Sequence, residues 1–374
     1  MKIGFCLFKY FPYGGLQRDF MDVALRCQAD GHEIYVYTLD WQGVQPDGFH
    51  INVIETRALS NHAKYAQYHQ QMMDCSQQDQ LDCLVGFNKM PGLNIYFASD
   101  PCYRARPHNW LQRLSPRYRH FLQFEQAVFA PASTTHILTL ATAQQQEYQQ
   151  AWQTDDGRFT LLTPGISMNA MATDDATELR HRVRQEFAVG DEEFLLLMVG
   201  SGFRTKGLDR ALNALAALPD QLQQQVKLVA IGQDKPDSFV KMAADMGLNQ
   251  QVRILPGRDD IAAVMQAGDC LLHPAHREVA GKVILEAVVG GLPVLVSDVC
   301  GYAHYVADAD AGYVFATPFD QQDFNAHLVK VLQDTDLRQG FRKNGIAYGQ
   351  QQDLYSMADT AARVIQERCG SGDH

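Results

Sequence analysis

The sequence lacks several features that would assign it to other classes of protein. Its 374 residues contain no apolar run long enough to cross a bilayer. The apolar run at residues 2–8 is too short for a signal peptide and has no small-residue cleavage site, so it predicts a first strand. The 8 cysteines are scattered without a Cys-x-x-Cys pair, which argues against disulfides and a zinc site. These observations together predict a cytoplasmic protein.

Excess positive charge and dinucleotide-binding glycines are also lacking. The net charge of -11 argues against a general affinity for nucleic acids. The chain begins with a strand–helix–strand pattern that is typical of a Rossmann-like sheet. No Gly-x-Gly-x-x-Gly follows its first strand, which counts against a dehydrogenase. Gly14 and Gly15 occupy that loop instead, either to let the backbone approach a ligand closely or as a plain turn.

Apolar strands alternate with helices along the whole chain. The rhythm is clearest in the second half, where we expect strands at residues 194–199, 226–231, 252–255, 270–272 and 294–296. Such alternation predicts parallel sheets with helices on both faces. The length suits two domains, and the turn at residues 164–165 is a hinge signal. The sequence therefore predicts an α/β protein of two Rossmann-like domains.

The stretch at residues 273–286 carries the strongest chemical signal. It links a predicted buried strand to a predicted helix, and Glu278 and Glu286 lie on either side of a small-residue turn at Ala280 and Gly281. A helix that begins near Gly281 directs its positive dipole end to the carboxyl edge of the sheet, which suits a phosphate. The two carboxylates would bind hydroxyl groups on either side of it. A nucleotide sugar fits this pattern, although paired glutamates are also common on solvated helix starts.

Two other loops at the same edge carry cations. Residues 200–207 follow a predicted strand and contain Arg204, Thr205 and Lys206, which suit a diphosphate, although surface cations are common. The loop at residues 257–260 contains Arg258 and two aspartates, which either contribute to a ligand site or cap a helix.

In the first half, Asp19 and Asp100 lie where we expect loops at the carboxyl edge of the sheet. Each of these aspartates either faces an acceptor or simply caps or solvates its loop.

A basic and aromatic segment interrupts this acidic chain at residues 103–129. Its first acidic residue is Glu125. Basic amphipathic segments with aromatic residues suit a surface of anionic lipids. The alternatives are a nucleic-acid patch, which the net charge disfavours, and a helix whose arginines extend along the domain surface. The expected membrane contacts are Arg104, Arg106, Trp110, Arg113, Arg117 and Arg119.

The two glutamates, followed by the glycine-rich stretch at residues 290–297, resemble the retaining glycosyltransferases of family 4. Residues 8–21, 86–93 and 300–305 narrow the resemblance to the lipopolysaccharide core glucosyltransferases of that family, and it covers nearly the whole chain. It implies a GT-B fold with an acceptor domain at residues 1–166, a donor domain at 167–351, and a helix at 352–368 that packs back on the first domain.

The resemblance also implies an activity. Glucose would pass from UDP-glucose, with retention, to a heptose of the lipopolysaccharide inner core, without an essential metal, on the cytoplasmic face of the inner membrane. Retention in this family is usually explained by front-face attack. The candidate catalytic residues are Glu278, Asp19 and Asp100. The candidate donor-binding residues are Gly14, Gly15, Arg204, Thr205, Lys206, Arg258, Glu278, Ala280, Gly281, Lys282, Val283 and Glu286.

Within that set the resemblance suggests particular roles. Lys206 corresponds to the diphosphate-binding lysine, Glu286 to the residue that holds the ribose, and Glu278 to the residue that holds the sugar. The loop of Gly15 would close over the diphosphate. The resemblance also predicts an arginine directly before Lys206, where this chain has Thr205, so Arg204 is the candidate second cation from one position earlier. The chain further lacks an arginine that its relatives place near residues 168–170, for which Lys282 is the candidate substitute.

Three alternatives remain at this stage. Another family 4 transferase with a different donor or acceptor would carry the same residues. A nucleotide-sugar epimerase or a phosphorylase shares the fold, but an epimerase has no need of the basic aromatic segment, and the phosphorylase lysine context is absent. A membrane scaffold would bind a nucleotide sugar without turnover.

Overall fold

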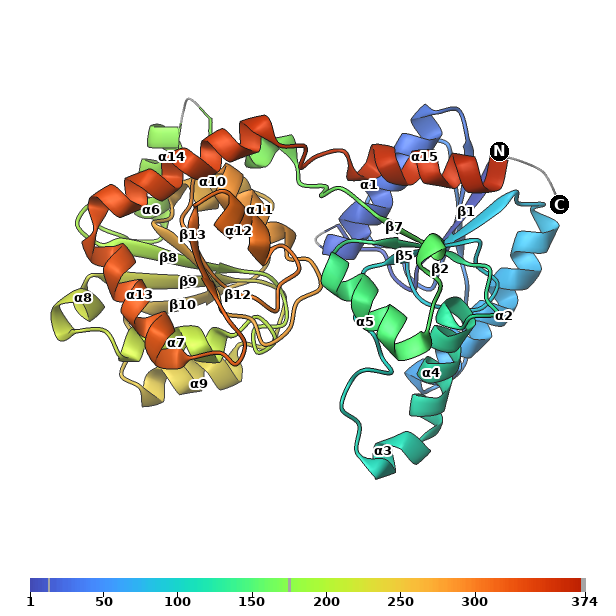
Figure 1. Cartoon of the computed structure of the whole chain (residues 1–374), viewed down its shortest axis with the longest axis horizontal. Helices are drawn as coiled ribbons and strands as arrows, with labels where there is room; N and C mark the ends of the chain where they lie inside the picture. Colours follow the sequence, from blue (N-terminus) through green and yellow to red (C-terminus); the bar gives the residue numbers. More distant parts are fainter. Residues whose placement is uncertain (13, 174–175, 371–374) are drawn as a thin grey trace. The chain divides into compact units, whose positions relative to one another are not determined.

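The computed structural model describes residues 1–12, 14–173 and 176–370. The chain divides into two compact units (Figure 1). The first unit is Met1–Gly165 with Ser356–His374, and the second is Ile166–Tyr355. The boundaries expected from the sequence, after residues 166 and 351, differ from these by a few residues. Residue 13 of the predicted glycine loop and residues 174–175 of the predicted linker lie outside the described residues.

The first unit contains a seven-stranded parallel sheet in the order β3-β2-β1-β4-β5-β6-β7. Its strands are β1 (Lys2–Cys6), β2 (Glu33–Thr38), β3 (Phe49–Val53), β4 (Cys83–Gly86), β5 (Ile95–Ala98), β6 (His136–Thr139) and β7 (Phe159–Leu161). The central strands β4 and β5 are apolar and buried along their whole length, because helices cover both faces of a doubly wound sheet. The strand order is that of a Rossmann-like sheet.

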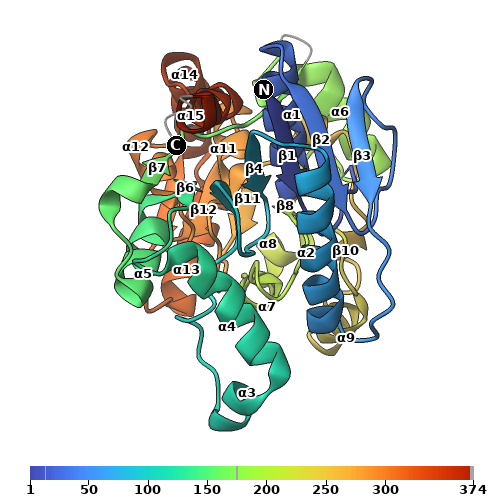
Figure 2. The same ribbon diagram turned by 90° about the vertical axis from the view of Figure 1, so that its right-hand side faces the viewer.

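The helices of the first unit form two groups. Helix α1 (Gly15–Ala29) packs against the last helix, α15 (Met357–Gly370), and Arg26 Nε lies 2.7 Å from Asp359 Oδ1. Side chains of three other helices share one core cluster: α2 (Asn61–Gln78), α4 (Pro116–Phe129) and α5 (Thr142–Trp152). The short helix α3 (Trp110–Leu114) lies at the end of an excursion away from the sheet of this unit (Figures 1 and 2).

One cysteine prediction is wrong. Cys83 in β4 and Cys369 in α15 form a disulfide, with their Cα atoms 5.6 Å apart. The two residues are 286 positions apart in the sequence, so no local spacing signals the pair. The return of α15 to the first unit brings them together. The other six cysteines are free thiols, and five of them are buried.

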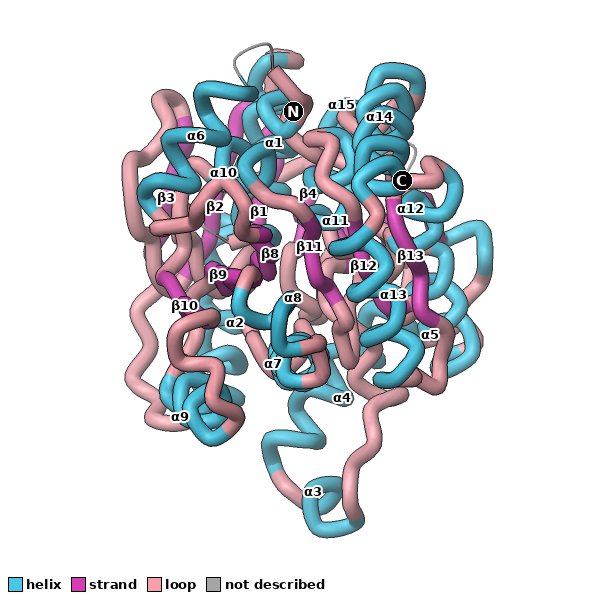
Figure 3. Tube along the Cα trace, turned by 90° about the vertical axis from the view of Figure 1, so that its left-hand side faces the viewer, coloured by secondary structure: helices cyan, strands magenta, loops and turns pink. Residues whose placement is uncertain are grey.

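The second unit contains a six-stranded parallel sheet in the order β10-β9-β8-β11-β12-β13 (Figure 3). Its strands are β8 (Phe194–Val199), β9 (Val226–Ile231), β10 (Val252–Leu255), β11 (Cys270–His273), β12 (Val294–Ser297) and β13 (Gly312–Phe315). Successive side chains of β8 enter different cores: Leu195 and Leu197 belong to one cluster, and Leu196 and Met198 to the other. This alternation explains why β8 reads as an unbroken apolar run.

Helices cover both faces of this sheet (Figure 1). One cluster includes side chains from α6 (Ala176–Glu186), α10 (Ile261–Ala267), α11 (Lys282–Val289) and α12 (Ala303–Asp308). The other includes side chains from α7 (Leu208–Ala216), α8 (Asp220–Gln224), α9 (Asp237–Asp245), α13 (Gln321–Gln333) and α14 (Thr335–Gln351). The predicted fold class is therefore confirmed. Among the residues that the structure describes, no helix is long and apolar enough to span a membrane.

Candidate functional site

The second sheet places two loops side by side at its topological switch point. The strand order reverses between β8 and β11, which pair with each other. In open α/β sheets, ligands bind at such a point, beyond the carboxyl ends of the strands. The loop after β8 contains Lys206, and the loop after β11 contains Glu278. The fold thus brings the two strongest sequence motifs of the second half to the place where a ligand is expected.

Hydrogen bonds tie these two loops together. The His276 backbone N–H donates to the Thr205 carbonyl at 2.8 Å. The Arg210 guanidinium, from the first turn of α7, donates to the carbonyls of Pro274 and Ala275 at 3.0 and 2.9 Å. The His276 ring also lies 3.0 Å from the Asp209 carboxylate. The rim of the site is therefore a braced structure rather than two independent loops.

Two glycines permit this close approach. Gly207 has a φ of 83°, and a Cβ atom there would lie 2.0 Å from the Pro274 carbonyl oxygen. Gly281 has a φ of 92° and is the N-cap of α11. Only glycine adopts such backbone angles at little cost. Larger residues would separate the loops at the first position and strain the start of α11 at the second.

Lys206 and Glu278 form an ion pair between the two loops. The lysine side chain is 18% exposed and the glutamate 13% exposed. The second carboxylate oxygen, Oε1, accepts from the Val279 N–H at 3.2 Å. Burial lowers the pKa of the Lys206 ammonium, and the nearby Cys300 opposes this shift. A partly desolvated ammonium gains more from an anionic ligand than one in water.

His273 is a site residue to which the sequence analysis assigned no role. It is the last residue of β11, and its side chain is fully buried. Its Nε2 lies 3.4 Å from Glu278 Oε2, without hydrogen-bond geometry. Burial and the Lys206 charge lower the pKa of its imidazole to about 3, so the ring is neutral. The signal available in the sequence was the position of a polar residue at the carboxyl end of a buried strand.

The N-terminus of α11 completes the site. Lys282 and Val283 are the first two residues of the helix, and Glu286 lies one turn further on and is partly exposed. First-turn amides and the helix dipole favour an anion at this end. Ala280 is buried, and its carbonyl accepts from the Tyr302 N–H at 2.9 Å. The Val283 side chain packs on the core. The side chains of Ala280 and Val283 therefore belong to the packing of the unit, which leaves their backbone as the part that can face a ligand.

Three other predicted donor-site residues have different surroundings. Arg204 and Thr205 are exposed in the loop after β8. The Arg258 guanidinium is held by two carboxylates, with bonds of 2.8 Å to Asp260 and 3.1 Å to Glu186 of α6. These bonds raise the pKa of Arg258 above its ordinary value. Arg258 thus fastens its loop to α6, and its side chain is occupied by the protein itself.

The first sheet has its own switch point between β1 and β4. There the Phe8 N–H donates to Asn88 Oδ1 at 2.7 Å, which joins the two loops. Gly14 is the N-cap of α1 and Gly15 its first residue, and Gly15 is exposed. Asp100 lies in the loop after β5, as predicted. The prediction for Asp19 is wrong in its location, because this residue lies within α1 and is only 3% exposed.

The basic aromatic segment forms α3, α4 and the loop before them. On α3, Trp110, Leu111 and Leu114 are 71%, 60% and 58% exposed. Arg113, Arg117 and Arg119 are exposed as well. Arg104 and Arg106 lie over aromatic rings, those of Trp152 at 4.5 Å and Tyr103 at 5.8 Å. Exposed large apolar side chains on α3 and exposed arginines on α3 and α4 therefore follow one another closely in this protruding segment.

Glu125, the only acidic residue of this segment, is fully buried and anchors the segment to its unit. Its carboxylate accepts from Lys89 Nζ at 2.6 Å, from the N–H groups of Tyr103 and Arg104 at 2.6 and 2.9 Å, and from Trp152 Nε1 at 3.0 Å. Burial alone would raise the pKa of Glu125, but Lys89 and the backbone donors outweigh it and lower the pKa. The exposed part of the segment is left with positive charge only.

Comparison with known proteins agrees with this geometry. The family model for "Glycosyl transferases group 1" matches residues 180–348, which include both loops of the site. HepE of Anabaena, solved in complex with UDP-glucose, shares the fold at a TM-score of 0.75 and 19% identity, over 98% of this chain and all of that one. The two doubly wound sheets and the matching model define a glycosyltransferase with the GT-B fold.

A more similar relative narrows this class. Lipopolysaccharide glucosyltransferase WaaG of Escherichia coli (strain K12) is 42% identical over 368 residues, 98% of each protein. The crystal structure of WaaG, a glycosyltransferase involved in lipopolysaccharide biosynthesis, covers 97% of this chain and 99% of that one at a TM-score of 0.94. The D-inositol 3-phosphate glycosyltransferase of Salinispora arenicola is 28% identical over 52% of this chain and 47% of its own. The chain belongs to the glycosyltransferase family of WaaG.

Proposed function

We propose that this glycosyltransferase transfers glucose from UDP-glucose to a heptose of the lipopolysaccharide inner core, with retention and without an essential metal. The observation that carries the proposal is the Lys206–Glu278 pair at the β8–β11 switch point, beside the N-terminus of α11. It provides a cation, a helix N-terminus and a carboxylate within one rim. The name of WaaG supports glucose and lipopolysaccharide. HepE shows that the fold can hold UDP-glucose, although 19% identity does not select that donor.

In this proposal, donor binding rearranges the ion pair. The diphosphate takes Lys206 as its partner and lies against the first-turn amides of α11. Glu278 then becomes available to accept hydrogen bonds from the sugar hydroxyls, while Glu286, one turn along α11, holds the ribose. The pair thus keeps both side chains in place when no donor is present.

The chemical step breaks the bond between the sugar and the diphosphate. Negative charge develops on the departing UDP, and Lys206 together with the α11 amides stabilises it. The acceptor hydroxyl attacks the same face of the sugar, and its proton passes to the leaving phosphate. These positive groups would perform the task for which other transferases use a metal ion. Asp100, at the carboxyl edge of the first sheet, is the candidate to contact the acceptor. Asp19 lies buried in α1, so it would act only by supporting the loops at the carboxyl edge of the first sheet.

We also propose that the enzyme lies on the cytoplasmic face of the inner membrane. Arginines and large apolar side chains on one surface suit a boundary between anionic head groups and acyl chains. The exposed Trp110, Leu111 and Leu114 of α3 would enter the boundary, and the arginines of α4 would contact the head groups. The acceptor is attached to a membrane lipid, so this attachment would keep the enzyme close to its substrate.

The test is UDP release from UDP-glucose by the purified protein, measured with EDTA present and again without it. Lipopolysaccharide truncated after its heptoses serves as acceptor, and lipopolysaccharide that lacks heptose is the control. We expect release that requires the heptoses and survives chelation. Release that stops with EDTA and returns with magnesium would contradict metal independence. Equal activity with UDP-galactose, or none with either acceptor, would reject the donor or acceptor assignment.

A further inference from the structure

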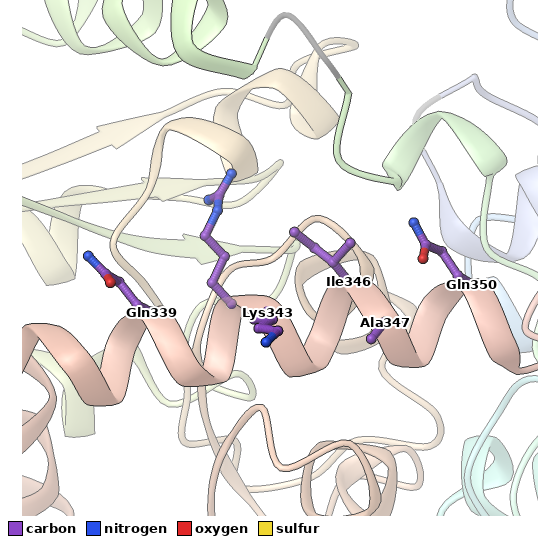
Figure 4. Close-up of a pocket in the computed structure, with 6 residues that line it drawn as sticks. Gln339, Lys343, Ile346, Ala347 and Gln350 are labelled. Carbon is purple, nitrogen blue, oxygen red and sulfur yellow. The ribbon is translucent and has the colours of Figure 1, made fainter.

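A second charged hollow lies at the opposite edge of the sheet of the second unit. It has a volume of about 350 Å³ and is lined by residues that precede the strands, including Asp269 before β11 and Pro293 before β12. Thr335, Arg338 and Arg342 of α14 and Arg180 of α6 also line it. A shallower pocket beside it, of about 420 Å³, continues along α14 past Gln339, Lys343 and Ile346 (Figure 4). The donor site lies at the carboxyl ends of these strands, so the two sites are distinct.

The charges of this hollow do not balance. Three guanidinium groups line it against one carboxylate, that of Asp269. Both oxygens of Asp269 are already in use. Oδ1 accepts from Arg180 at 2.6 Å, and Oδ2 accepts from Arg184 at 3.0 Å and from the Leu195 N–H at 2.7 Å. Asp269 therefore bonds to Arg180 and Arg184, whereas the hydrogen bonds of Arg338 and Arg342 go to carbonyl and hydroxyl groups.

Arg180 and Arg338 are held in place by carbonyl groups. Arg180 Nη1 donates to the Ala267 carbonyl at 2.6 Å. Arg338 Nη1 donates to the carbonyls of Val331 and Leu332, each at 2.6 Å, and Nη2 donates to Thr335 Oγ1 at 3.0 Å. Such fixed guanidinium groups lose little entropy when an anion arrives.

Arg342 has the weakest partner of the three. The bond that it makes, to the Gly291 carbonyl, is 3.5 Å long. Its stem packs on Gly291, where a Cβ atom would lie 3.0 Å from Arg342 Cγ. The side chain is half buried, and burial and the charge of Arg180 lower its pKa more than the charge of Asp269 raises it. A half-buried guanidinium beside another cation gains much from an added anion.

We propose that this hollow binds a phosphate group, either of a small phosphate monoester or of a lipid head group. The forked donors of Arg342 match the oxygens of phosphate. The fixed guanidinium groups of Arg180 and Arg338 add positive charge, and Thr335 and Thr177 line the same hollow. Its volume suits a small phosphorylated molecule. Gly291, just beyond the C-terminal end of α11, lines the hollow, while Gly281 caps the other end of that helix at the donor site.

The experiment must separate this site from the donor site, so it uses the full chain carrying Lys206→Gln. Inorganic phosphate and glycerol 3-phosphate are titrated by calorimetry into this protein and into the same protein with Arg342→Gln added. We expect binding that the added change weakens by about tenfold or more, since a charge-assisted hydrogen bond is lost. Arg342→Lys should give an intermediate loss. Lys343→Gln removes a neighbouring cation of α14 that does not line the hollow and should leave binding unchanged.

A final arm distinguishes the two sources of phosphate. Vesicles of phosphatidylcholine with phosphatidic acid are compared with pure phosphatidylcholine. A lipid source predicts that Arg342→Gln weakens binding to the acidic vesicles, whereas a soluble source predicts an effect on glycerol 3-phosphate alone. Failure of every probe to bind at millimolar concentration, or equal binding with and without Arg342→Gln, would overturn the proposal. If Arg342→Gln lowers the melting temperature, the phosphate affinity of Arg342→Lys, which keeps the positive charge, is used to judge the proposal instead.

Discussion

Each unit has a lysine–glutamate pair at the carboxyl edge of its sheet, and the two pairs differ in how many hydrogen bonds the carboxylate accepts. In the first unit, Glu125 is fully buried and accepts from Lys89, two backbone N–H groups and Trp152. In the second unit, Glu278 remains partly exposed and is bound to Lys206 and the Val279 N–H. Glu125 has no remaining capacity for a ligand, whereas Glu278 has both access and capacity.

The comparison shows that an ion pair alone does not mark a functional site. A carboxylate surrounded by donors from several elements holds those elements together, and its value lies in stability. A partly exposed carboxylate with one cation as its main partner can exchange that cation for a ligand. Replacing each glutamate should therefore affect a different property of the protein, and this difference is open to measurement.

The largest effect is expected from Glu125→Gln. The change leaves Lys89 buried without a counter-charge and weakens the bonds to the loop before α3, which should cost about 3–5 kcal/mol of unfolding free energy. All three tryptophans, Trp41, Trp110 and Trp152, lie in the first unit. Urea unfolding followed by tryptophan fluorescence therefore reports on that unit. The double variant Lys89→Met with Glu125→Gln should recover part of the loss. An unchanged midpoint for the single variant would remove Glu125 as an anchor.

Glu278→Ala should produce the opposite pattern. We expect turnover to fall by a factor of about 10²–10³, as when one group that stabilises a transition state is lost. Unfolding free energy should change by about 1 kcal/mol or less, as for a partly exposed residue. The measurement is turnover of UDP-glucose beside urea unfolding followed by circular dichroism. Losses of stability and activity in the same proportion would reassign Glu278 to structure.

Vesicle binding by the basic aromatic segment of the first unit should depend on its positive charge. Replacing Arg113, Arg117 and Arg119 with serine should weaken binding to anionic vesicles by roughly a hundredfold, at about 1 kcal/mol for each arginine near the surface. The affinity for UDP should stay the same. The matched control replaces three exposed cations of the second unit, Arg182, Lys235 and Lys241, with serine. An equal loss in the control would mean that the vesicles respond to net charge alone.

The sequence predicted the second unit more accurately than the first. Strands β8, β9 and β10 were expected at the residues where they occur, because continuous apolar runs bounded by turns are a strong signal. Helix α2 was missed. It is rich in glutamine and histidine, and its buried residues are Tyr68, Met72 and Ser76, so its apolar stripe is too narrow to give a clear period.

The sequence was enough to predict which loops form the candidate site, but it did not predict which of their side chains contact each other. The positions of Lys206 and Glu278 after two apolar strands indicated one edge of one sheet. Their direct pairing, and the place of His273 behind them, depend on loops about seventy residues apart and on the glycines that allow them to touch. In the sequence, Glu125 is only the first acidic residue of a basic segment. Its burial could not be predicted, because its partners come from distant parts of the chain.

The smallest effect expected concerns acid stability and the two buried histidines. Burial lowers the pKa of His273 in the second unit to about 3, and burial with Arg368 and Arg158 lowers that of His136 in the first unit to about 4. An unfolded histidine takes up a proton below about pH 6.5, but these two do so in the folded state only at lower pH. Stability is therefore complete above pH 6.5 and falls as the pH decreases.

For His273 the loss should reach about 2 kcal/mol at pH 5, from one proton taken up by the unfolded state alone. Glutamine at position 273 stays neutral at every pH. The unfolding free energy of His273→Gln should therefore fall less steeply between pH 6.5 and 4, with a slope that corresponds to the uptake of about one proton fewer on unfolding. His136→Gln should flatten the curve of the first unit in the same way, with its effect ending nearer pH 4. Circular dichroism follows both units, and tryptophan fluorescence follows the first. A His273→Gln curve parallel to that of the unmodified protein would mean that the folded protein protonates His273 as readily as the unfolded chain does, and that the ring beside Glu278 is accessible to water.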